Sequence, residues 1–70
     1  MQQGTIITYE DGTQDKVVGT DELGLVPVVL LEPVTWRRSA DKWKSLRVVE
    51  EMAKAGKWKV ERPRRERVRL

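Results

Sequence analysis

The fold is decided by residues 5–18, TIITYEDGTQDKVV. Two runs rich in β-branched residues flank the dipeptide Asp11-Gly12 in this stretch. Asp-Gly between two such runs is among the strongest short signals for a β-hairpin, because both central residues of a type I′ turn need a positive φ. We therefore predict an antiparallel hairpin with a two-residue turn, in which Ile7 faces Lys16.

The chain beyond this hairpin predicts a loop and a third strand. Residues 19–24 begin and end with glycine and read as a loop. The apolar run 26–31, VPVVLL, predicts a strand that is buried on both sides or lies centrally in the sheet. Pro27 restricts this strand, because proline is confined to the start of a strand or to an unpaired edge. Glu32-Pro33 should close the strand, or residues 34–37 could continue it after a kink at Pro33.

One amphipathic helix is predicted between Ser39 and Gly56. Serine is a preferred N-cap, Asp41 falls in the first turn, where the helix dipole favours an acid, and glycine is the preferred residue just after a helix. On a helical wheel the charged residues fill one arc and the apolar residues the opposite one, as expected for a helix on a protein surface. The apolar arc consists of Leu46, Val48, Val49, Met52, Ala53 and Ala55.

Residues 57–62 alternate in polarity, with Trp58 and Val60 on one face, and predict a strand after the helix. Residues 63–70 should form either a basic edge strand or a flexible tail. The predicted fold is therefore a single α+β domain over residues 1–62. It consists of an antiparallel sheet of three to five strands packed on one amphipathic helix.

The composition argues against an enzyme. The 70 residues include no Cys and no His. The chain therefore has no disulfide and no thiol nucleophile, and it lacks histidine, the commonest general base. Neither of its two serines has a histidine to activate it. We expect no catalytic residue, no cofactor, no metal and no small-molecule substrate. No apolar run approaches the roughly 18 residues of a membrane span, so we also expect no membrane contact and a cytoplasmic location.

The charge is distributed unevenly along the chain. Residues 1–35 carry six acids and one base, a net charge of −5, whereas residues 36–70 carry thirteen bases and five acids, a net charge of +8. Such asymmetry is a pointer to a polyanionic or oppositely charged partner. The alternative is that the two halves neutralise each other across the sheet.

Tryptophan accompanies the basic residues in two places. Trp36 is followed by two arginines, and Trp43 should lie half exposed at the edge of the helix's apolar arc. An exposed tryptophan beside arginine can stack on nucleic-acid bases or anchor a protein interface, although both rings could instead cap a thin core. The candidate binding residues are Trp36, Arg37, Arg38, Lys42, Trp43, Lys44, Arg62, Arg64, Arg65 and Arg67.

Two functions fit these features. The first is a non-enzymatic binding protein whose Arg/Lys-rich C-terminal half contacts nucleic-acid backbone, where each neutralised phosphate releases counterions. The second is a protein that docks on an acidic surface, and Glu61 and Glu66 within the basic segment favour it. The size, the lack of Cys and His and the Arg-rich end are similar to those of small accessory proteins of phages and mobile elements. This resemblance implies docking on a larger host enzyme or on the transcription machinery. A third possibility is that the basic segment only promotes solubility.

Overall fold

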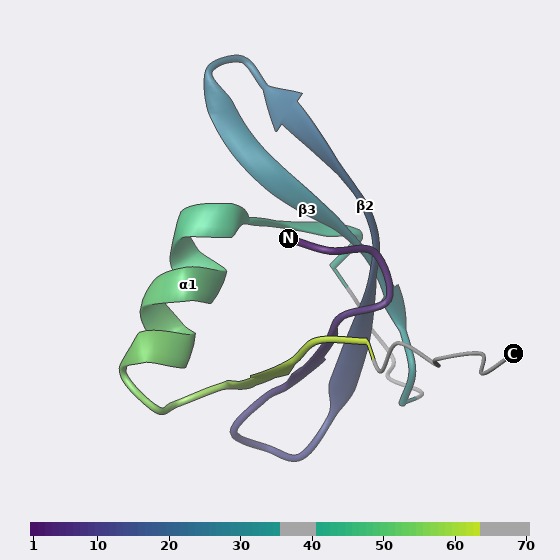
Figure 1. The fold of residues 1–70 in the computed structure, drawn as a ribbon, viewed down its shortest axis with the longest axis vertical. Coiled ribbons are helices and arrows are strands. Elements are labelled where there is room, and N and C mark those ends of the chain that lie inside the picture. Colours follow the sequence, from purple (N-terminus) through teal and green to yellow (C-terminus); the bar gives the residue numbers. More distant parts are fainter. Residues whose placement is uncertain (36–40, 64–70) are drawn as a thin grey trace, which may run out of the picture.

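The computed structural model describes residues 1–35 and 41–63. Within these residues, five antiparallel strands form one sheet in the order β4-β3-β2-β1-β5, and a single helix lies beside it (Figure 1). The predicted α+β class, with an antiparallel sheet and one helix, is confirmed. The elements are β1 (Ile6–Thr8), β2 (Gln14–Leu23), β3 (Val26–Pro33), β4 (Trp43–Ser45), α1 (Leu46–Lys54) and β5 (Lys59–Glu61).

The first hairpin forms, but its predicted register is wrong by one residue. Ile7 pairs with Asp15 and not with Lys16. A shift of one residue moves every side chain of a strand to the other face of the sheet. The observed register leaves Lys16 exposed and buries Ile7 and Val17 completely.

The shift arises because the turn holds three residues instead of two. The amide of Gly12 donates to the carbonyl of Tyr9 at 3.0 Å, and the amide of Tyr9 donates to the carbonyl of Thr13 at 2.9 Å. Gly12 has a φ of +89°, and no residue other than glycine has a positive φ in the described chain. This is the three-residue hairpin loop in which a type I turn is followed by a left-handed glycine. The carboxylate of Asp11 holds the loop by accepting from the amide of Thr13 at 3.0 Å.

Gly12→Val is expected to lower the free energy of unfolding by about 1–3 kcal/mol, the cost of holding a non-glycine residue in the left-handed region. A Cβ atom at position 12 would meet nothing within 4 Å, so the loss would report the backbone and not a clash. Gly19→Ala is the control, because φ there is not left-handed and the added Cβ would lie at ordinary van der Waals distance from Leu30. Urea unfolding followed by circular dichroism measures both variants. Wild-type stability of Gly12→Val would contradict the observed turn.

The second hairpin is longer than the sequence predicts. The sequence predicts a loop over residues 19–24, but β2 continues to Leu23, which pairs with Val26. Only Gly24 and Leu25 connect the two strands. Gly24 occupies the first central position of the turn with a φ of +65°, as a type II′ turn requires. The loop prediction fails because the apolar third strand supplies hydrogen-bond partners along this polar stretch, which composition alone does not show.

The predicted start of the helix is also wrong. Ser39 lies outside the described residues, and Trp43–Ser45 forms the edge strand β4, in which Trp43 pairs with Leu30 of β3. The helix begins at Leu46, and Ser45 at the N-cap makes no capping side-chain hydrogen bond. Local capping signals therefore overestimated the helix, because they take no account of the free edge that β3 offers to the residues before position 46.

The predicted end of the helix is confirmed. Gly56 has a φ of +77°. The amide of Gly56 donates to the carbonyl of Ala53 at 3.1 Å, and the amide of Lys57 donates to the carbonyl of Met52 at 3.0 Å. These are the two hydrogen bonds of a Schellman motif, in which a left-handed glycine satisfies the last carbonyls of a helix.

The core lies between the sheet and α1. Five buried side chains form its centre, and several half-buried residues pack around them. Val48, predicted to face the core, is 46% exposed, so the apolar stripe of α1 is narrower than the wheel suggested. Trp58 and Val60 pack against the core as predicted, and β5 pairs with β1. The central residues are Ile7, Val17, Val29, Leu31 and Val49.

Candidate functional site

The described candidate residues come from two separate elements of the sheet. Lys42, Trp43 and Lys44 lie at or just before β4, whereas Arg62 follows β5, at the other end of the sheet order. The remaining six candidates lie outside the described residues. Residues 64–70 also lie outside them, so the choice between an edge strand and a tail for the C-terminal segment stays a prediction. These six are Trp36, Arg37, Arg38, Arg64, Arg65 and Arg67.

Lys44 belongs to an internal side-chain cluster. Its ammonium pairs with the carboxylate of Asp41 at 2.6 Å and lies 5.2 Å from the ring centroid of Tyr9 and 5.8 Å from that of Trp58. The two rings meet edge to face, with their centroids 4.8 Å apart. Because β4 and β1 are not neighbours in the sheet, these contacts show that the sheet curls. With its side chain only 20% exposed, Lys44 is poorly placed to contact a partner.

Lys42 and Trp43 are better placed. Both are exposed, and Trp43 keeps 48% of its surface accessible. The carbonyl of Lys42 accepts from the amide of Leu31 at 2.8 Å, which ties this residue to β3. Trp43 is therefore half exposed, as predicted, but on a strand instead of a helix. Its ring stands at the sheet edge, a few residues after segment 36–40.

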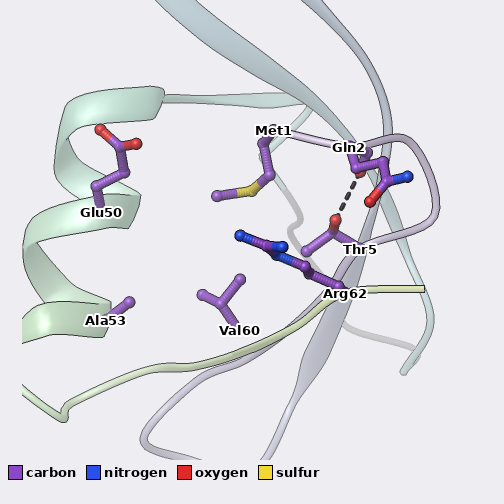
Figure 2. Close-up of a pocket in the computed structure, with 7 residues that line it drawn as sticks. All are labelled: Met1, Gln2, Thr5, Glu50, Ala53, Val60 and Arg62. Carbon is purple, nitrogen blue, oxygen red and sulfur yellow. Dashed lines mark hydrogen bonds between the residues drawn. The ribbon is translucent and has the colours of Figure 1, made fainter. Parts of the chain in front are cut away.

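Arg62 contributes to a pocket between α1 and the sheet. Figure 2 shows its guanidinium extending over the pocket, between Met1 and Val60. The pocket has a volume of about 410 Å³, and its lining includes one carboxylate, that of Glu50 on α1. The hydroxyl of Thr5 donates to the carbonyl of Gln2 at 2.6 Å. The lining is otherwise apolar, so these groups can hold a ligand but do not form an acid–base pair. The described residues that line it are Met1, Gln2, Thr5, Glu50, Ala53, Val60 and Arg62.

The net positive charge of the chain lies in residues 36–40 and 64–70. Residues 1–35 and 41–63 carry eight basic and ten acidic side chains, a net charge of −2. The whole chain carries 14 basic and 11 acidic side chains. Segments 36–40 and 64–70 therefore hold the other six basic side chains and one acid, a net charge of +5. The described residues are slightly acidic, and these two short segments carry the net positive charge of the chain.

Sequence reasoning missed an apolar surface at the end of the β2–β3 hairpin. Leu23 is 46% exposed, Val26 49% and Leu25, within the turn, 96%. The sequence predicts Val26 in a buried strand and the other two residues in a loop or at its border. The signal that could have revealed this surface is the dipeptide Gly24-Leu25 between the apolar residues Leu23 and Val26. Glycine at the first position of a two-residue turn is typical of a type II′ hairpin.

Within residues 1–35 and 41–63, no helix is long and apolar enough to cross a membrane. The cytoplasmic location stays a prediction. In the same part of the chain, no three acidic side chains come close enough together to hold a metal ion. No family model, curated protein or solved structure matches the chain. Its function is therefore inferred from the surfaces described above.

Proposed function

We propose that the protein is a non-enzymatic binding protein whose two basic segments, residues 36–40 and 64–70, contact the phosphate backbone of nucleic acid. The observation that carries this proposal is the segregation of charge, since the segments hold a net +5 while the described domain holds −2. A concentration of basic side chains is the electrostatic footprint of a nucleic-acid-binding protein. Six of the chain's fourteen basic residues lie in these twelve positions, and all six are arginine, which binds phosphate with two parallel hydrogen bonds.

The described residues beside the segments support the same function. Lys42 and Trp43 are exposed shortly after segment 36–40, and the exposed Arg62 precedes segment 64–70. A basic side chain next to an exposed indole suits a single strand, whose bases stack on aromatic rings in a sequence-tolerant way. We therefore expect binding without strong sequence preference.

Replacing Arg64, Arg65 and Arg67 by alanine should weaken binding to nucleic acid. If all three contact phosphate, the slope of log affinity against log salt for a duplex should shrink by roughly 2.7 units, at about 0.9 per contact. Fluorescence anisotropy of a labelled duplex and of a labelled single strand, measured from about 50 to 200 mM salt, gives both affinity and slope.

The matched control is the triple replacement of Lys16, Arg47 and Lys54 by alanine. These residues are exposed in the described domain, and their loss changes the net charge by the same amount. We expect this control to retain most of the salt dependence. Equal slopes for the two triple variants would show that only total charge matters. No binding of the wild type at about 50 mM salt, where such contacts are strong, would end the proposal.

The alternative is an accessory protein that docks on a larger protein. The exposed apolar residues of the β2–β3 hairpin favour it, because a contiguous exposed apolar patch commonly marks an interaction site. Docking through the hairpin would use a different surface from the basic segments, so the two functions can be tested separately.

A further inference from the structure

We infer that the end of the β2–β3 hairpin, residues 21–27, docks on a partner protein that offers an apolar cleft bordered by lysine or arginine side chains. This hairpin tip includes the most exposed apolar side chain in the described part of the chain, Leu25. Its neighbours Leu23 and Val26 are about half exposed. Three apolar side chains on one tight turn form an exposed apolar patch, a feature that commonly marks an interaction site.

The hairpin tip extends past the strands that flank the rest of the hairpin. β1 pairs only with Gln14–Lys16 of β2, and β4 only with Val28–Leu30 of β3. The outer part of the hairpin is therefore a two-stranded ribbon, and it projects beyond the helix and the other strands (Figure 1). The type II′ turn fixes its shape, so little conformational entropy is lost when it enters a cleft.

The charge beside the apolar residues identifies the chemistry of the partner. Asp21 and Glu22 are both exposed on β2, and neither forms an ion pair in the described chain. Within residues 1–35 and 41–63 their side chains make one hydrogen bond, which is local: the amide of Glu22 donates to the carboxylate of Asp21 at 2.8 Å. Two unpaired carboxylates at the border of an apolar anchor are complementary to basic side chains around an apolar cleft.

A groove extends this surface toward α1. It has a volume of about 480 Å³ and lies between the hairpin tip and the first residues of the helix. Val26 and Pro27 form one side, and Leu46 and Arg47 the other. A hairpin turn alone buries too little surface for a stable complex, which needs about 800 Å² from each partner. The groove allows the partner to insert a side chain of its own beside the hairpin tip.

The same charges disfavour two other occupants. If the hairpin tips of two copies met, four carboxylates would come together, and like charges at an interface are costly. If the tip entered a membrane, its carboxylates would face the negative potential of anionic lipids. A heterologous protein partner satisfies both the apolar and the acidic side chains.

The experiment places a photo-reactive amino acid at position 23 of the full chain. After irradiation in an extract of the cells that make the protein, the adduct is digested and the crosslinked peptide identified by mass spectrometry. We expect one partner protein, crosslinked within an apolar cleft that has lysine or arginine at its border. With this partner purified, Leu25→Ser should weaken the Kd at least about tenfold, as the loss of an anchoring residue does. Asp21→Lys with Glu22→Lys should do the same, most strongly at low salt.

Val34→Ser is the matched control. Val34 is also about half exposed, but it follows the opposite end of β3, and its loss should leave the Kd unchanged. The triple arginine variant should also leave it unchanged, which separates this inference from the nucleic-acid proposal. Because Leu25 is fully exposed in a turn, Leu25→Ser should keep the wild-type melting temperature.

Several outcomes would overturn the inference. One is the absence of an adduct, and another is a crosslinked site without basic residues. A third is a Kd that stays at the wild-type value both in Leu25→Ser and in Asp21→Lys with Glu22→Lys. Dimerisation of the purified chain in sedimentation experiments, abolished by Leu25→Ser, would make a second copy the occupant. If the wild type but not Leu25→Ser floated with phosphatidylcholine–phosphatidylglycerol vesicles, the occupant would be a lipid surface.

Discussion

Ile7→Ala is expected to lower the free energy of unfolding by about 2–5 kcal/mol, the range for truncating a buried isoleucine to alanine. Ile7 is completely buried and lies in β1, between β2 and β5. It belongs to the central cluster together with Val17 and Val49, so the cavity would open where the sheet and α1 meet. A 70-residue domain has a stability of only about 3.5–10 kcal/mol, at 0.05–0.15 per residue. The variant should therefore be partly unfolded at moderate temperature.

The control for this change is its neighbour. Ile6 lies on the same strand but on the opposite face, and it is only half buried. Ile6→Ala should cost clearly less than Ile7→Ala in urea unfolding followed by circular dichroism. The two variants have the same composition, so their difference reports only which face meets the core. If Ile6→Ala were the more damaging change, β1 would present its other face to α1 and the observed register would be wrong.

The sequence predicts the presence of the first hairpin but not its register. Asp11-Gly12 marks the turn correctly, because glycine is needed at a positive φ in both the two-residue and the three-residue loop. The two loops differ in the conformation of Asp11, and this is settled by its carboxylate accepting from Thr13. A one-residue difference in loop length then changes every pairing in the hairpin.

Errors in the second half of the sheet have a different cause. The end of the helix depends on Gly56, whose conformation is a local property, and it was predicted correctly. The start of the helix depends on β4, which exists because β3 has a free edge. The strand character of residues 19–23 depends in the same way on pairing with β3. Pairing between distant segments is not encoded in the residues nearby, so local patterns mistook one strand for a loop and another for part of a helix.

The candidate site was predictable only in part. The concentration of arginine in segments 36–40 and 64–70 is visible in the sequence. The internal role of Lys44 is not, because it depends on the curling of the sheet, which brings Tyr9 and Trp58 within reach of its ammonium. Nor can the exposure of Leu25 be read from its type, since an apolar residue between strands is buried or exposed according to the turn that holds it.

Trp58→Ala is expected to lower the free energy of unfolding by about 3 kcal/mol, the lower end of the range for removing a tryptophan from a core. The ring is half buried and packs against the central cluster. Its edge-to-face contact with Tyr9 contributes about 0.5–1.5 kcal/mol beyond burial. Its position beside the ammonium of Lys44 helps to hold β4 near β5. Urea unfolding followed by circular dichroism measures the loss.

Trp43→Ala removes the same side chain from a site that is half exposed at the sheet edge. We expect a loss of about 0.5 kcal/mol, as for other surface substitutions. If Trp43 stacks on bases, its removal should weaken single-strand binding by about 1–3 kcal/mol while the fold survives. Trp58→Ala should therefore lower stability, whereas Trp43→Ala should lower single-strand binding, although both remove the same type of side chain. A Trp43→Ala variant that unfolds as readily as Trp58→Ala would place its ring in the core and remove it from the nucleic-acid interface.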